Sequence, residues 1–532
     1  MFNNQEGDRK AHGAKSGVDI GKGRERRQQQ TVSVRKDKRN EMLEKKRRHD
    51  TNYDAGVVSN MDPMSFTSKT NPQDVPLELL PSFVQMVMSN DHNLVCHGVL
   101  MIRKLLSIEQ SPPIEQCVQS GVLPYLVQIM GRDDIPQLQF EAAWAVTNIA
   151  SGTREHSNLV IETGAVPLFI HLLGSPSEDC MEQATWGIGN IAGEGAQCRD
   201  YVLSCGVMEP LLRLIMSPVK ITIIRNAVWA LSNLCRSKPQ PPLEIISPAL
   251  PVLASMLMHS DDEVVVDAAW AISYISDGPN DRIQAVLQSG VLNRIVQLLA
   301  HPTAAMKTPA IRTVGNIATG NDHQTQTIIN AGALPMMVFL LQEPKRNIRK
   351  ETCWTISNIC AGHRDQIQAV INANIFPILY ESLRANELEV RKEAVWAISN
   401  TATMGSREQI RYMVESGVIP PLCDVLTTYD AKIVAVGLEA LQSILSLGEV
   451  LREESGAERN VWADLVTQCG GLDYIERCLN HSNTEVYHNA LQLLESFFEL
   501  SNTAEGDMPA LNATGSAFEF GANNSEYGNY NF

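Results

Sequence analysis

Apolar residues in this chain recur at three- and four-residue steps within short segments, and these segments return about every 42 residues. One such segment is SGVLPYLVQIM, which starts at Ser120. Close copies start at Thr163, Cys205, Ser289, Ala331 and Ser416. Steps of three and four place the apolar side chains on one helical face. The glycine before the run suits the left-handed position that ends a helix, and a proline just inside it suits a first turn. The pattern therefore predicts a series of short amphipathic helices.

A second repeated motif has a tryptophan four residues before Asn or Tyr. It reads WAVTN, WGIGN, WALSN, WAISY, WTISN and WAISN, at Trp144, Trp186, Trp229, Trp270, Trp354 and Trp396. A further window, RTVGN, has Arg312 in the Trp position, and the successive spacings are 42, 43, 41, 42, 42 and 42. Units of forty-odd residues with two or three helices are typical of armadillo and HEAT repeats. We predict an all-α fold, a right-handed α-solenoid of about ten repeats between Val75 and Leu500, with the Trp motif on each third helix.

Charge divides the chain into segments. Residues 1–49 carry 15 Lys and Arg against 7 Asp and Glu, whereas the remainder has a net charge of −24. We therefore expect a basic, disordered arm over 1–49, a flexible linker over 50–74 and the solenoid over 75–500. Residues 501–532 are acidic and rich in Asn, Tyr and Gly, and we expect a disordered, mobile tail there.

The sequence contains little that would indicate a zinc-binding, disulfide-rich, membrane or dinucleotide-binding protein. The 11 cysteines form no C-x-x-C pair, which argues against a zinc site or a disulfide framework and favours reduced core thiols. With no signal peptide and no uninterrupted apolar stretch of membrane-spanning length, the sequence predicts a soluble intracellular protein without membrane insertion. The glycines of GIGNIAGEG, from Gly187, have the wrong spacing and context for a dinucleotide site. We predict no enzymatic activity, no cofactor and no metal.

The Trp and Asn of each motif lie on one helical face, so stacked third helices would present them as a ladder. Asn can grip the N–H and C=O groups of an extended peptide, and neighbouring indoles can hold the stem of Lys or Arg. The alternative is that Trp and Asn only pack one repeat on the next. We favour the groove because a hydrogen-bonding side chain repeated at this position is expected to add nothing to an apolar interface.

At this point the chain resembles the importin-α (karyopherin-α) family over nearly its whole length. The resemblance covers the basic arm RERRQQQTVSVRKDKRNEMLEKKRRH, the Trp/Asn array and the tail ending in YNF. It implies a nuclear import adaptor that binds basic nuclear localization signals of cargo, associates with importin-β and shuttles between cytoplasm and nucleus. It also implies an export receptor that acts with Ran-GTP. A catenin-like armadillo scaffold in adhesion or signalling remains the alternative, although such scaffolds tend to present a basic groove.

Tyr274 in an Asn position and Arg312 in a Trp position break the ladder into two parts. The resemblance implies that these parts are a major and a minor site for localization signals. The major site comprises Trp144, Asn148, Gly152, Ser157, Trp186, Asn190, Glu194, Trp229, Asn233 and Asp267. The minor site comprises Asn316, Thr325, Glu351, Trp354, Asn358, Glu393, Trp396 and Asn400. Because the two sites are four repeats or about 40 Å apart, a ligand with two basic clusters needs about 12 residues or slightly fewer between them.

The resemblance also assigns roles within the arm. Arg24 to His49 is similar to the family's importin-β-binding segment, and its basic side chains are Arg24, Arg26, Arg27, Arg35, Lys36, Lys38 and Arg39. The cluster Lys45, Lys46, Arg47 and Arg48 matches the residues that occupy the protein's own groove when importin-β is absent. The alternative is a nuclear address, or a nucleic-acid-binding arm. A self-ligand makes the arm autoinhibitory.

Overall fold

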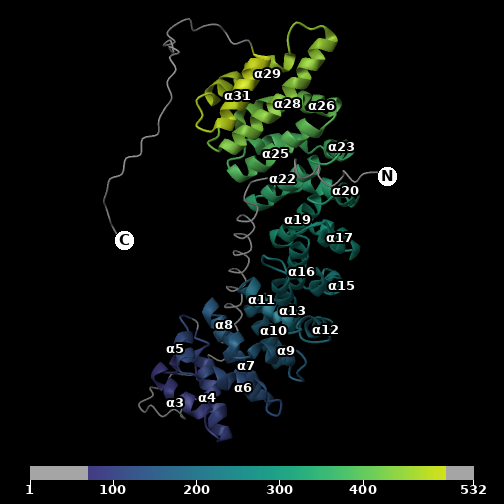
Figure 1. Cartoon of the computed structure of the whole chain (residues 1–532). Coiled ribbons are helices and arrows are strands. Elements are labelled where there is room, and N and C mark those ends of the chain that lie inside the picture. The colour runs from purple at the N-terminus through teal and green to yellow at the C-terminus, as the bar shows by residue number, and fades with distance from the viewer. Residues whose placement is uncertain (1–66, 68–69, 109, 499–532) are drawn as a thin grey trace, which may run out of the picture.

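The computed structural model describes residues 67, 70–108 and 110–498. The predicted arm (1–49), all but a few residues of the predicted linker (50–74) and the predicted tail (501–532) lie outside the described residues. Within the described ranges every regular element is a helix, and the helices stack into one elongated array from the purple N-terminal end to the yellow C-terminal end (Figure 1). This architecture confirms the predicted all-α solenoid.

The described residues form ten successive units. The first has the short 3-10 helices η2 (Pro72–Asp74) and η3 (Leu77–Leu79) before α3 (Leu80–Val87) and α4 (His92–Leu105). Each of the next nine has three helices and is called repeat 1 to repeat 9. Repeats 1 to 3 are α5 (Ile114–Gln119), α6 (Leu123–Met130), α7 (Pro136–Ala150); α8 (Arg154–Glu162), α9 (Ala165–Leu172), α10 (Glu178–Gly193); and α11 (Ala196–Ser204), α12 (Met208–Ile215), α13 (Ile221–Leu234). Repeats 4 to 6 are α14 (Leu243–Ile246), α15 (Ala249–Met256), α16 (Asp262–Ile275); α17 (Asn280–Gln288), α18 (Leu292–Leu298), α19 (Ala304–Ala318); and α20 (Asp322–Asn330), α21 (Ala333–Leu340), α22 (Arg346–Cys360). Repeats 7 to 9 are α23 (Arg364–Asn372), α24 (Phe376–Leu383), α25 (Leu388–Met404); α26 (Arg407–Glu415), α27 (Ile419–Val425), α28 (Ala431–Ser455); and α29 (Val461–Gln468), α30 (Gly471–Cys478), α31 (Thr484–Phe497).

The turn between the first and second helix of a repeat explains the recurrent glycine. Gly164 between α8 and α9 has φ 85°, and six other repeats have a glycine with positive φ at this position. In repeat 7 the position is taken by Asn374 with φ 55°, and Asn is the residue that tolerates this conformation best after Gly. The predicted left-handed position is therefore confirmed.

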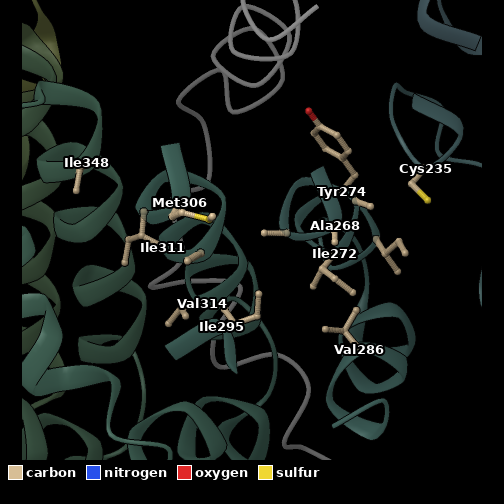
Figure 2. Packing of buried hydrophobic residues seen from close by; sticks show 14 of the residues in the cluster. Cys235, Ala268, Ile272, Tyr274, Val286, Ile295, Met306, Ile311, Val314 and Ile348 are labelled. Carbon is tan, nitrogen blue, oxygen red and sulfur yellow. The ribbon is translucent and has the colours of Figure 1, made fainter. Parts of the chain in front are cut away.

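The third helices form a continuous inner row in which each packs on the next, from α7 through α10, α13, α16, α19, α22 and α25 to α28. One apolar core runs along the array from Val75 to Leu494. Figure 2 shows part of this core, where side chains such as Ile272 and Val286 in repeats 4 and 5 lie between the helices. All 11 cysteines are free thiols and 8 of them are buried, as predicted.

Polar ties join neighbouring repeats along two further rows. On the first helices, the side-chain amides of Gln324, Gln366 and Gln409 donate to backbone carbonyls of the preceding repeat, at 3.0, 2.9 and 2.8 Å. On the third helices, a basic side chain pairs with the acidic N-cap of the next third helix. These pairs are Arg225–Asp261, Arg349–Glu387 and Lys392–Asp430. These ties help to fix repeats 3 and 4, and repeats 5 to 8, relative to one another.

Repeat 8 departs from the others because its third helix, α28, has 25 residues. By length and composition alone this helix could cross a membrane, but 67% of its apolar window is buried inside the fold. Such burial is the behaviour of a core helix, and α28 packs against α25, α27, α29 and α31.

Candidate functional site

The tryptophans and asparagines of the repeated motif all lie on third helices, as predicted. Trp144 and Asn148 are in α7, Trp186 and Asn190 in α10, and Trp229 and Asn233 in α13. Further along the row, Asn316 is in α19, Trp354 and Asn358 in α22, and Trp396 and Asn400 in α25. Since these helices pack on one another in order, the structure places the residues along one continuous row. We call the residues of α7, α10 and α13 the first group and those of α19, α22 and α25 the second.

The side-chain amides of the asparagines form hydrogen bonds to the preceding repeat. The side-chain nitrogens of Asn190, Asn233, Asn316 and Asn400 donate to the backbone carbonyls of Thr147, Gly189, Ser273 and Ser357 in the preceding third helix, at 3.4, 2.9, 2.9 and 2.8 Å. Our premise that a hydrogen-bonding side chain adds nothing between repeats is therefore wrong. The carbonyl partner can only accept, so the nitrogen and not the oxygen of each amide faces the preceding helix.

Asn358 differs from these four. Its side-chain nitrogen is buried and has no hydrogen-bond partner among the described residues. The side chain as a whole is only 5% exposed. A buried donor without a partner costs free energy, so this amide nitrogen adds no hydrogen bond between the repeats, unlike the other four.

Indoles of the row pack against small residues of the preceding third helix. Trp186 and Trp229 are 3% and 8% exposed and form one cluster with the half-buried Trp144. A Cβ on Gly189 would lie 2.4 Å from Cζ3 of Trp229. In the second group a Cβ on Gly315 would lie 2.4 Å from Cζ3 of Trp354. The glycines therefore set how deep the indoles sit.

One indole already holds a cation of this protein. The guanidinium of Arg103, in α4, lies 4.4 Å from the ring centroid of Trp144 and its Nε donates to Glu141 at 2.6 Å. An indole face paired with a carboxylate three residues earlier is the arrangement predicted for a bound Lys or Arg. The sequence analysis missed Arg103, because nothing in the Trp motif indicates its partner in α4.

The predicted carboxylates divide by burial. Asp267 and Glu351 are 1% and 3% exposed, whereas Glu393 is half-buried, and each lies three residues before the Trp position of its helix. Gln183 and Asn226 hold the same position in repeats 2 and 3, and each has one buried polar atom without a hydrogen-bond partner. The sequence analysis missed both, although their spacing from Trp186 and Trp229 was a signal that could have found them.

Glu194 caps the C-terminus of α10 and is half-buried. Its charge acts on Arg236, whose pKa is lowered by burial and is held up in part by Tyr274 and Glu194. The guanidinium of Arg236 also donates to the carbonyl of Gly193 at 2.8 Å. Glu194 thus lies at the helix end where the major site was predicted, with a cation in its surroundings.

Ser157 and Thr325 occupy equivalent buried positions in repeats 2 and 6. The Ser157 hydroxyl donates to the carbonyl of Ala150 at 3.0 Å, and the Thr325 hydroxyl lies 3.4 Å from the equivalent carbonyl of Ala318 and 3.1 Å from the carbonyl of Asn321 in its own N-cap. Both hydroxyls therefore tie a first helix to the end of the third helix before it. Gly152 lies close by, where a Cβ would come within 2.4 Å of Nδ1 of His156.

The predicted break in the ladder lies in α16 and α19. The Tyr274 ring stacks on Trp270 of its own helix, with centroids 5.7 Å apart and planes at 24°. Arg312 is 3% exposed in α19. A small pocket next to this break has the following lining: Trp229, Ser232, Asn233, Arg236, Asp267, Trp270 and Tyr274. Over the described ranges no three His, Cys, Asp or Glu side chains gather as a metal site.

Comparison with known proteins identifies the class first. The armadillo/beta-catenin-like repeat model matches residues 110–151, 153–193, 195–236, 237–277, 279–319, 321–361, 363–403 and 406–446, and an atypical Arm repeat model matches 460–510. The crystal structure of an engineered protein superposes with a TM-score of 0.70 at 27% identity, covering 78% of this chain and 98% of its own. The fold is an armadillo-repeat solenoid.

The particular family follows from the relatives. "Importin subunit alpha-2" of Arabidopsis thaliana is 50% identical over 526 residues, which cover 97% of each chain. "Importin subunit alpha-B" of Dictyostelium discoideum is 47% identical over 520 residues, again 97% of each chain. The importin beta binding domain model matches residues 9–99. This chain belongs to the importin subunit alpha family.

Proposed function

We propose that this protein is a nuclear import adaptor, which binds basic localization signals of cargo in the Trp/Asn row and associates with importin-β through its N-terminal segment. One observation carries the proposal. The chain combines an acidic solenoid, lined by indoles and asparagines, with a basic segment inside the range matched by the importin beta binding domain model. Membership in the importin subunit alpha family favours this function over a catenin-like scaffold.

The two groups along the row act as separate peptide sites in this proposal. The group in α7, α10 and α13, with Gly152, Ser157, Glu194 and Asp267, forms the major site. The group in α19, α22 and α25, with Thr325, Glu351 and Glu393, forms the minor site. The contact of Arg103 with Trp144 and Glu141 supports this assignment, since it shows one such surface holding a cation within the protein.

The basic arm is both a partner segment and an internal competitor. Arg24 to Arg39 engage importin-β, and Lys45 to Arg48 compete with cargo when importin-β is absent. An unstructured chain of about 27 residues, the separation of His49 and Val75, would span about 29 Å, and a tether of that length would supply an effective concentration of about a millimolar. Both segments lie outside the described residues.

The adaptor role includes movement through the nuclear pore between cytoplasm and nucleus. Return to the cytoplasm uses an export receptor together with Ran-GTP, and no catalytic step is assigned to this chain. In this proposal cargo and the basic arm occupy the same groove in turn, cargo during import and the arm after cargo is released.

Peptide binding tests the proposal directly. Fluorescence anisotropy with a labelled basic peptide should give tighter binding to protein lacking residues 1–49 than to the full chain. Changing Lys45–Arg48 to alanine in the full chain should raise the affinity for the peptide by most of the same amount. Adding importin-β to the unmodified chain should raise the affinity in the same way. Binding should weaken as salt increases, because the charged contacts are partly exposed. Equal affinity of the full and shortened chains would exclude the internal competitor.

The adaptor role itself needs a separate measurement. In permeabilised cells, cargo import should require this protein with its arm, and the shortened chain should bind peptide without supporting import. Import by the shortened chain at the full rate would contradict the link to importin-β.

A further inference from the structure

Two thiols meet at the boundary between repeats 8 and 9, far from the Trp/Asn row. Cys423 is in α27 and is 0% exposed, whereas Cys469 caps the C-terminus of α29 and is partly exposed. The two side chains are in hydrogen-bond contact with each other. One residue of the pair is therefore partly exposed and the other is buried, and the Cys469 thiol also donates to the carbonyl of Val466 at 3.3 Å.

The backbone around the pair brings the sulfurs together. A Cβ on Gly471 would lie 2.4 Å from the sulfur of Cys423, so the absence of a side chain there lets Cys423 reach the turn between α29 and α30. Gly470, with φ 77°, turns the chain directly after Cys469. The helices α29 and α30 both pack on α27. The contact is thus part of the packing of repeat 9 on repeat 8.

The pairing changes the acidity of the two thiols in opposite directions. The hydrogen bond from Cys423 is the largest cause that lowers the pKa of Cys469 to about 6, and the backbone amide of Gly471 adds to it. The same contact, together with burial, raises the pKa of Cys423. A lowered pKa favours the thiolate of Cys469, which is the nucleophilic form of cysteine. Cys423 stays protonated and close to it.

We propose that Cys423 and Cys469 are a peroxide-sensitive dithiol, which closes to a disulfide that links repeat 8 to repeat 9. The oxidant is hydrogen peroxide. The Cys469 thiolate attacks one peroxide oxygen, the O–O bond breaks, and the products are a sulfenic acid on Cys469 and hydroxide, which takes a proton from solvent to become water. Cys423 then gives up its proton and its sulfur attacks the Cys469 sulfur. An S–S bond forms, the S–O bond breaks, and the hydroxyl leaves with that proton as a second water.

The disulfide would constrain the terminal repeat. It would close a loop that contains all of α28, joining α27 to the end of α29, so that repeat 9 could not separate from repeat 8. Terminal repeats of a solenoid have a neighbour on one side only and are the first to open. Oxidation is therefore expected to protect the C-terminal end of the array from local unfolding.

Mass spectrometry of the full-length protein tests the cross-link. After treatment with hydrogen peroxide, proteolysis under non-reducing conditions should yield one linked peptide pair that contains Cys423 and Cys469, and a reducing agent should separate it. The pair should be absent from Cys423→Ser and Cys469→Ser, and should persist in Cys96→Ser, a matched change at another partly exposed cysteine. Oxidation of Cys469 to sulfinic acid in the unmodified chain, without the linked pair, would overturn the proposal.

Alkylation rates give a second readout that does not require the disulfide. At pH 7 iodoacetamide should modify Cys469 at least about tenfold faster than Cys96, whose pKa is raised by burial. Cys423→Ser should slow the modification of Cys469 while circular dichroism shows the same helix content. Equal rates at Cys469 and Cys96 in the unmodified chain would refute the activated pair.

Discussion

At the scale of single residues, Asn190 and Asn358 hold equivalent positions in α10 and α22 but differ in what their amide nitrogens contact. Asn190 donates to the carbonyl of Thr147, whereas the Asn358 nitrogen has no partner among the described residues. Asn190→Ala should therefore cost stability, by about 0.5–1.5 kcal/mol for the lost hydrogen bond, as well as affinity for peptide. Asn358→Ala should leave the melting temperature nearly unchanged.

The effect of the two changes on peptide affinity is measured with protein that lacks residues 1–49 and with two labelled peptides. Asn190→Ala should weaken a peptide with one basic cluster, and Asn358→Ala should weaken chiefly a peptide with two clusters, each by about five- to tenfold, or about 1 kcal/mol. If Asn358→Ala destabilised the protein as much as Asn190→Ala, the distinction between an amide that bridges two repeats and one that does not would fail.

A second residue-scale prediction concerns acid. The hydrogen bond from Arg225 is the largest cause that lowers the pKa of Asp261, which also caps α16. A carboxyl with a depressed pKa in the folded state stabilises the protein above its unfolded pKa of about 4, and that contribution is lost as the pH falls through the folded value. Thermal melting between pH 7 and pH 3 should therefore show a smaller loss of stability for Asp261→Asn, which keeps the cap, than for the unmodified chain. The same pH dependence in both would contradict the prediction.

At the scale of helices, glycines of one third helix set the depth of the indole on the next. Gly189→Ala would push a methyl group into Trp229, and Gly315→Ala would do the same to Trp354. Each change should destabilise the protein by about 1–3 kcal/mol, since overpacking forces neighbours to move. Gly189→Ala should weaken peptides at the major site and Gly315→Ala at the minor site.

The matched control for these two variants is Gly131→Ala. A Cβ there would meet its nearest neighbour at 3.4 Å, an ordinary contact at the end of α6. Calorimetric titration with the two labelled peptides would separate the sites. A Gly189→Ala protein with unchanged affinity for a single basic cluster would argue against the role given to Trp229.

Most of the structural features that recur from repeat to repeat could be predicted from the sequence. The spacing of the Trp motif gave the third helices, and the glycine before each second helix gave the turn confirmed at Gly164. It could not predict that Asn190 and its equivalents face carbonyls of the preceding helix, because that depends on how one repeat is set against another. It missed Arg103 for the same reason, since the partner of Trp144 lies in α4, outside the motif.

At the scale of the whole molecule, the two groups are separated by the break at Tyr274 and Arg312. Asn190 and Asn358 are four repeats apart, which corresponds to about 40 Å at about 10 Å a repeat. A bipartite peptide with about 10–12 residues between its basic clusters should bind more tightly than one whose spacer has about five, because the short spacer cannot span the groups. Anisotropy across a spacer series would measure this, and equal affinity throughout would exclude simultaneous use of both groups.

Glutamines on the first helices tie repeats 5 to 8 to one another, and asparagines on the third helices tie repeat 5 to repeat 4 and repeat 7 to repeat 6. Each joint adds one small rotation, and the superhelical pitch is the sum of these rotations. The length of a ligand that is bound at both groups therefore constrains the superhelical pitch. Spacers of different length would select more tightly or more loosely wound forms of the same protein, with the strain shared among the four joints between the groups.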